Sequence, residues 1–175
     1  MAPCLLTAQE RRSIPLDLYL IIDTSEGFQE ARNETVNWLN EQVIDRLLME
    51  GDRMVIWSAG STARVIHSET VGTQKNEAKD KLRNIEISGS VADFSGALGD
   101  AASRATRENP RGDRISYTMI VSGSAENLAP SIEGNSSGIF RWFRAEKYSR
   151  WQVLVAGPNI NQKVRQAAAA YMSSR

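Results

Sequence analysis

Leu16-Asp17-Leu18-Tyr19-Leu20-Ile21-Ile22 is the clearest structural signal in the chain, and the polar segment Asp23-Thr24-Ser25-Glu26-Gly27 follows it directly. A short apolar run that ends in a polar, glycine-containing loop is typical of a strand buried on both faces. Such strands occur in α/β proteins, where helices cover both sides of the sheet. We therefore expect helices and strands to alternate around this first strand.

The downstream sequence shows this alternation. Apolar residues recur every three or four positions over 36–48 and again over 94–105, which predicts two helices with one apolar face each. Gly51 is expected to end the first of these helices, because glycine tolerates a left-handed backbone. Further helices are predicted over 75–84, 139–147 and 160–171, and further strands over 54–57, 64–67, 117–121 and 152–157.

The strands at 54–57 and 64–67 are joined by a tight turn at Gly60-Ser61-Thr62. They must be antiparallel, because a parallel return needs about a dozen residues or more. The predicted fold is therefore α/β: a three-layer α/β/α, doubly wound, mostly parallel sheet with one antiparallel edge strand. Residues 1–13 are expected to form a flexible tail before a single domain at 14–175.

The composition is ordinary for a globular protein and argues against one class of partner. Of 175 residues, 21 are basic and 21 acidic. A nucleic-acid-binding surface would need a basic excess to hold phosphates, so nucleic acid is not expected as a partner. Cys4 is the one cysteine, which excludes an internal disulfide, and no membrane span is expected in this sequence. Localisation is left open, because flanking sequence could carry a signal or an anchor.

Ligands of open α/β sheets bind at the carboxyl ends of the strands, and three polar loops are expected to meet there. The first follows the first strand, at residues 23–27. The second precedes the alanine-rich helix, at residues 89–95, and the third follows the strand at 117–121, at residues 122–127. We therefore expect the functional site at this edge of the sheet.

At these loops the sequence resembles the von Willebrand factor A (vWA) domain family, and the order of elements extends the resemblance over almost the whole chain. The family carries Asp-x-Ser-x-Ser after its first strand, where carboxylate and hydroxyl oxygens hold a divalent cation, usually magnesium. Asp23 and Ser25 match this motif, and Gly27 stands in place of its last serine. Ala92 stands where the family's second loop has threonine, and Gly123 where its third loop has aspartate. The resemblance therefore implies a degenerate metal-ion-dependent adhesion site, and a chain shortened before a final strand.

Two interpretations of these loops stay open. In one, Asp93 and Glu126 replace the lost ligands and hold Mg²⁺ or Ca²⁺ together with Asp23 and Ser25, because hard oxygen ligands suit these ions. In the other, which is our expectation, no cofactor is bound. Asp23 and Ser25 then satisfy nearby backbone amides, as Asp and Ser commonly do in turns and at helix starts.

A binding module is expected rather than an enzyme. A haloacid dehalogenase-type phosphatase needs a second aspartate two residues after the first, but Ser25 holds that position and cannot act as a general acid at neutral pH. The resemblance implies that another protein is the partner, bound where the three loops meet. Aromatic residues interleaved with arginines near residue 142 are also typical of interfaces. The residues expected to contact the partner are Glu26, Ser95, Ser124, Glu126, Trp142 and Arg144.

Three further features lie outside these loops. Arg111-Gly112-Asp113 spells an integrin-recognition tripeptide, although the same residues suit a simple polar turn between a helix and a strand. His67, the one histidine, cannot by itself form a metal cluster or a hydrolase triad, and we expect it to be a half-exposed strand residue. Trp38 falls off the apolar stripe of its helix and is expected at the surface.

Overall fold

The computed structural model of the chain describes residues 12–123 and the strand at 151–156. Within this part of the chain, five strands form one sheet in the order β3-β2-β1-β4-β5. β1 pairs in parallel with β2 and β4, and β4 pairs in parallel with β5, whereas β2 and β3 are antiparallel. The predicted parallel sheet with an antiparallel edge strand is thus confirmed. The strands are β1 (Leu16–Asp23), β2 (Arg53–Ala59), β3 (Ala63–Thr70), β4 (Ile115–Val121) and β5 (Trp151–Ala156).

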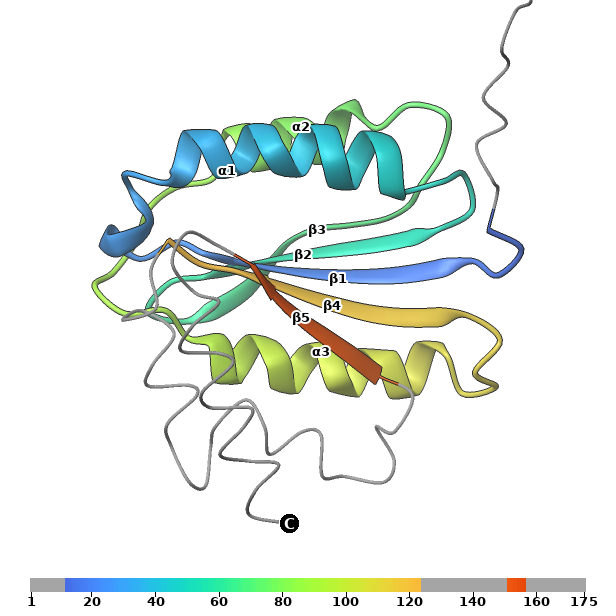
Figure 1. The fold of residues 1–175 in the computed structure, drawn as a ribbon. Helices are drawn as coiled ribbons and strands as arrows, with labels where there is room; N and C mark the ends of the chain where they lie inside the picture. Colours follow the sequence, from blue (N-terminus) through green and yellow to red (C-terminus); the bar gives the residue numbers. More distant parts are fainter. Residues whose placement is uncertain (1–11, 124–150, 157–175) are drawn as a thin grey trace, which may run out of the picture.

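Helices cover both faces of the sheet (Figure 1). On one face lie α1 (Arg32–Trp38), the π-helical segment η2 (Leu39–Leu47) that continues it, and α2 (Asn76–Arg83). On the other face lies α3 (Phe94–Glu108). A single 3-10 turn, η1 (Glu26–Phe28), leads from β1 towards α1. The three layers agree with the prediction.

The central strand β1 contributes to two hydrophobic cores, because successive side chains of a strand point to opposite faces. Leu18, Leu20 and Ile22 belong to the core under α1, η2 and α2. Tyr19 and Ile21 belong to the core under α3, whose buried face is mostly alanine. These five residues are at most 1% exposed. Burial on both faces explains why the sequence of β1 is a nearly continuous apolar run.

The carboxyl end of the first long helix differs from the prediction. Helical structure ends at Leu47, and Leu48 is already extended (φ −76°, ψ 139°). Gly51, predicted as the stop, lies at φ 88° in the turn before β2. Because η2 is π-helical and bonds five residues back, its apolar stripe drifts, and Leu47 is 37% exposed although it was predicted on the apolar face. Trp38 is 42% exposed, as expected.

His67 is buried, so the prediction of a half-exposed residue was wrong. The pairing of β2 with β3 shifts register at Ile66, which is the extra residue of a β-bulge. The imidazole Nε2 lies 3.3 Å from Glu69 Oε1, and Nδ1 lies 3.8 Å from Glu77 Oε1 in α2. His67 therefore lies against α2, which an edge-strand position alone does not predict.

Several predictions fall on parts of the chain that the structure does not describe. The helices predicted over 139–147 and 160–171 lie outside the described residues, as do residues 1–11 of the flexible tail predicted over 1–13. In the part that is described, no helix has the length and apolar character needed to cross a membrane.

Candidate functional site

The loops after β1 and β4 meet at one edge of the sheet, because these two strands are parallel neighbours. Asp23 ends β1 and Ser122 directly follows β4; the Ser122 hydroxyl donates to Asp23 Oδ2 at 2.6 Å. Asp23 Oδ1 accepts the Ser25 amide at 2.8 Å and the Ser25 hydroxyl at 2.6 Å. All three residues are fully buried, with 0% exposure. The Asp23 carboxylate therefore satisfies a local amide and also ties the first loop to the third.

The position of the family's third-loop aspartate is sterically closed. A Cβ atom on Gly123 would lie 2.8 Å from the carbonyl oxygen of Gly27 and 2.9 Å from the Cα of Phe28. Both neighbours are backbone atoms, which cannot rotate away as a side-chain tip could, and close-packed interiors leave no room for such overlap. No side chain, aspartate included, fits at position 123 while the first loop keeps this conformation. Two positions that differ from the family motif, Gly27 and Gly123, thus pack against each other.

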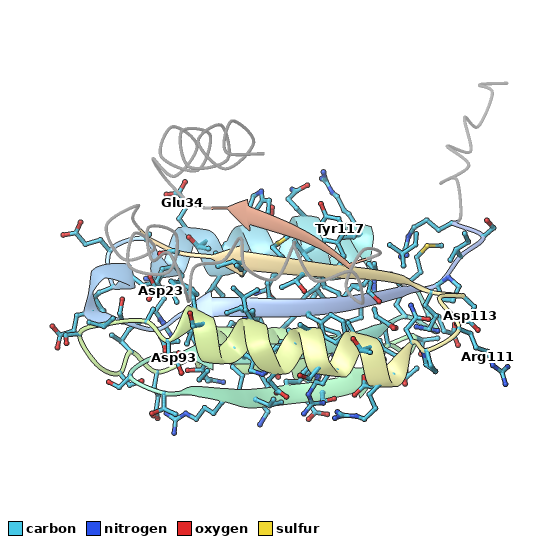
Figure 2. The ribbon with its side chains drawn as sticks, turned by 90° about the horizontal axis from the view of Figure 1, so that it is seen from below. Asp23, Glu34, Asp93, Arg111, Asp113 and Tyr117 are labelled. Carbon is cyan, nitrogen blue, oxygen red and sulfur yellow. The ribbon has the colours of Figure 1, made fainter. Side chains whose placement is uncertain are left out.

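Asp93 lies at the same end of the sheet as Asp23 (Figure 2) and caps α3. Its Oδ1 accepts the amide of Gly96 at 2.8 Å, and its Oδ2 accepts the amide of Ala63 at 3.2 Å. The Asp93 amide in turn donates to the carbonyl of Gly60 at 2.8 Å. The carboxylate that was predicted as a replacement metal ligand therefore joins the start of α3 to the β2–β3 hairpin.

Thr24 and Ser58 belong to the same junction, and the sequence analysis did not single them out. The two hydroxyls are 2.9 Å apart, and the Thr24 amide donates to the carbonyl of Ala59 at 3.0 Å. The Ser88 amide, one residue before the second loop, donates to the Thr24 carbonyl at 2.6 Å and holds the start of that loop against the first. The only signal in the sequence was an unbroken Asp-Thr-Ser after a buried strand, and nothing in it pointed to Ser58.

The described donors fit a divalent cation poorly. Among residues 12–123 and 151–156, no group of three or more His, Cys, Asp or Glu side chains is placed to hold a metal ion. Among the described residues, the groups bonded to the Asp23 carboxylate include the hydroxyls of Ser25 and Ser122, which both donate to it, and no second carboxylate is bonded to this group. One negative charge in a fully buried position would leave a divalent cation undercompensated.

The edge of the sheet above this junction carries exposed polar and apolar side chains. Glu26 is exposed and Ser95 is half-buried, and both were predicted to contact a partner. Val91 is 57% exposed and Ser90 lies beside it, yet neither was predicted. The predicted contacts Ser124, Glu126, Trp142 and Arg144 lie outside the described residues.

No protein-family profile matches the sequence, and no curated protein matches it either. Solved structures share its fold. A von Willebrand factor type A protein from Catenulispora acidiphila matches with a TM-score of 0.55 and 16% identity over 83% of this chain. The manganese-loaded TRAP protein of Plasmodium vivax matches with a TM-score of 0.59 and 17% identity over 89%. Proximal thread matrix protein 1 of the mussel byssus, with a zinc-occupied MIDAS motif, matches with a TM-score of 0.52 and 17% identity over 82%.

The chain corresponds to only part of each of these structures. It covers 33% of the Catenulispora protein, 63% of TRAP and 35% of the mussel protein. Identities this low carry the fold and not the activity of the whole proteins. Together with the parallel sheet, its antiparallel edge strand and the helices on both faces, the matches show that this chain has the von Willebrand factor A fold.

Proposed function

We propose that the chain is a vWA-type protein-binding module that recognises its partner at the carboxyl edge of the sheet without a complete metal site. The observation that carries this proposal is the packing of Gly123 against Gly27 and Phe28. This packing closes the position from which a third-loop carboxylate would reach the cation. Recognition then depends on the shape and hydrogen-bonding groups of the loops.

The loops are suited to this kind of recognition because buried hydrogen bonds hold them together. Asp23 links the first loop to Ser122, and Thr24 links it to Ser88. A surface that is already ordered loses little conformational entropy on binding, which favours affinity. The exposed side chains of Glu26, Ser90 and Val91 offer a partner a small apolar contact flanked by polar groups.

The environment of Asp23 supports binding rather than phosphoryl transfer. A nucleophilic carboxylate has to reach the substrate, but Asp23 is fully buried and both of its oxygens accept hydrogen bonds. We therefore propose that the chain is not an enzyme and expect no turnover of a phosphomonoester such as p-nitrophenyl phosphate. Turnover that disappears in Asp23→Asn would overturn this part of the proposal.

The partner-binding edge can be tested by photo-crosslinking in the source cells. A crosslinking amino acid at Val91 is expected to capture a protein, whereas the same amino acid at Ile14, an exposed apolar residue before the start of β1, is expected not to capture it. The purified partner should then bind Val91→Arg at least about tenfold more weakly than wild type, with Ile14→Arg unchanged. Equal binding by both variants would contradict the proposed surface.

A metal-dependent module is the second candidate, and the manganese-loaded TRAP and zinc-occupied mussel structures favour it by analogy. In that case Asp23 and Ser25 would bind a cation with help from other oxygens, as in the remodelled site considered above. The same crosslinked partner separates the two candidates. Binding that is unchanged in EDTA supports recognition by loop shape, whereas binding that EDTA abolishes and Mg²⁺ or Mn²⁺ restores supports the metal-dependent site.

A further inference from the structure

The loop between α3 and β4 is held in place by the side chain of Asn109. Its Nδ2 donates to the carbonyl of Arg114 at 2.7 Å and to the Ser116 hydroxyl at 3.2 Å. The Gly112 amide donates back to the Asn109 carbonyl at 3.2 Å. One residue therefore bonds the start of the loop to its tip and to its end, which restricts the conformations of the residues between.

Arg114 anchors the end of this loop to the body of the sheet. Its Nε donates to Asp17 Oδ1 at 2.5 Å, and its Nη2 donates to the carbonyls of Leu16 and Gly51 at 3.1 and 3.0 Å. Asp17 is almost fully buried in β1, so Arg114 is bonded to a fixed part of the sheet. The loop therefore emerges from fixed ends.

The tip of the loop presents Arg111, Gly112 and Asp113. Gly112 has φ 64°, a left-handed conformation that side chains disfavour. Arg111 and Asp113 are exposed, and within the described residues neither side chain makes a hydrogen bond or an ion pair. Asn109 and Arg114, on either side of the tip, both hydrogen-bond to other parts of the chain. The charged groups of Arg111 and Asp113 make no such bond within the described residues. Figure 2 shows them at the opposite end of the sheet from Asp23 and Asp93.

We infer that this turn is a second binding surface, an Arg-Gly-Asp ligand for an integrin-type receptor that holds a divalent cation beside an acidic pocket. The Asp113 carboxylate supplies an oxygen ligand to the receptor's cation, because carboxylates are preferred ligands of hard cations. The Arg111 guanidinium pairs with a receptor carboxylate. Because the loop is already held in one conformation, the tripeptide loses less conformational entropy on binding than a flexible peptide would. This surface is separate from the proposed partner-binding edge.

The test is binding of a purified RGD-recognising integrin ectodomain to the immobilised full chain in Mn²⁺. Wild type is expected to bind, and a Gly-Arg-Gly-Asp-Ser peptide, but not Gly-Arg-Gly-Glu-Ser, is expected to compete. Asp113→Glu keeps the charge and lengthens the side chain by one methylene, and it should weaken binding at least about tenfold. Arg107→Lys, an exposed change just before the loop, is the matched control and should bind as wild type does.

Two further variants test the mechanism. Asn109→Ala should weaken binding while circular dichroism shows a folded chain, because it removes the clamp and leaves the tripeptide intact. Asp80→Asn, an exposed carboxylate removal in α2 outside both proposed surfaces, should leave binding unchanged. No binding by wild type, or equal binding by Asp113→Glu, would overturn the inference and leave the loop as an ordinary polar turn.

Discussion

A fully buried carboxylate needs polar partners in place of the water it has lost, and at Asp23 these partners include three hydrogen-bond donors among the described residues. The Ser25 amide, the Ser25 hydroxyl and the Ser122 hydroxyl all lie within 2.8 Å of its oxygens. A bound cation is another way to meet the same requirement. The hydroxyls therefore allow Asp23 to remain a structural carboxylate in the absence of a metal.

Gly123→Asp restores the family residue at the third loop and is expected to damage the site. The new Cβ would overlap backbone atoms of Gly27 and Phe28, so the loops must separate, at a cost of about 1–3 kcal/mol in unfolding free energy. Gly72→Asp is the matched control, because a Cβ at Gly72 has no atom within 4 Å. Urea unfolding measures both variants, and titration calorimetry should find no gain in Mg²⁺ affinity. Tight Mg²⁺ binding by Gly123→Asp would show that the loop opens readily.

Tyr19 is expected to make the free energy of unfolding fall as the pH becomes alkaline. Burial raises the pKa of its phenol above the ordinary value, with a further contribution from the negative charge of Asp17. The unfolded chain releases this proton at a lower pH than the folded chain, so Tyr19's contribution is complete below about pH 10 and declines as pH rises further. Urea unfolding between about pH 8 and pH 11 should show this decline in wild type.

Tyr19→Phe should show a smaller decline over the same pH range. Within the described residues the Tyr19 hydroxyl is buried without a hydrogen-bond partner. Its removal should therefore leave stability at pH 7 unchanged or raise it by up to about 1 kcal/mol. The same slope in both proteins would assign the alkaline loss to other groups.

At the scale of elements, Asp17 joins three strands at the amino edge of the sheet. It lies in β1 and accepts Arg53 Nε from β2 at 2.7 Å and Arg114 Nε, just before β4, at 2.5 Å. The hydrogen bond to Asp17 raises the pKa of Arg53. This buried carboxylate therefore fixes the strand ends, just as Asp23 fixes the loops at the other edge.

Asp17→Asn should destabilise the chain by about 2–4 kcal/mol, because the carboxylate that compensates two partly buried guanidinium groups is lost. Asp80→Asn is the matched control; Asp80 is exposed and pairs with Arg83 within one turn of α2, so its loss should change stability by less than about 0.5 kcal/mol. Urea midpoints compare the two. Similar midpoints would mean that the arginines find other acceptors.

At the scale of the whole molecule, the two edges of the sheet present different chemistry. The carboxyl edge presents Glu26, Ser90 and Val91 above a buried hydrogen-bonded junction, whereas the amino edge presents the charged tip Arg111-Gly112-Asp113. Figure 2 shows the two ends on opposite sides of the covered sheet. The two proposals together place one binding surface at each of these ends.

A global consequence of the closed junction concerns thermal stability. A ligand that binds only the folded state raises the unfolding temperature, by an amount that grows with its concentration relative to Kd. We expect the midpoint of wild type to be the same in EDTA as in millimolar Mg²⁺, Ca²⁺ or Mn²⁺. A rise with one of these ions that Asp23→Asn removes would favour the metal-dependent candidate.

The sequence by itself determined the architecture. The apolar run of β1, the spacing of apolar residues in α3 and the short turn between β2 and β3 each reflect burial or chain geometry over neighbouring residues. They therefore predicted the three layers and the antiparallel edge strand correctly. Local patterns also placed Asp23 and Ser25 at the carboxyl edge of the sheet.

Tertiary structure decided the rest, because the deciding contacts join residues far apart in the chain. Ser122 donates to Asp23 across 99 positions, and Gly123 packs against Gly27. In the sequence, Gly27 and Gly123 are two separate departures from the family motif. In the structure they lie against each other, with no room for a side chain at position 123. The bulge beside His67 depends likewise on strand pairing. Propensity and spacing describe a segment and its near neighbours, whereas hydrogen bonds and steric exclusion between loops exist only once the sheet has brought those loops together.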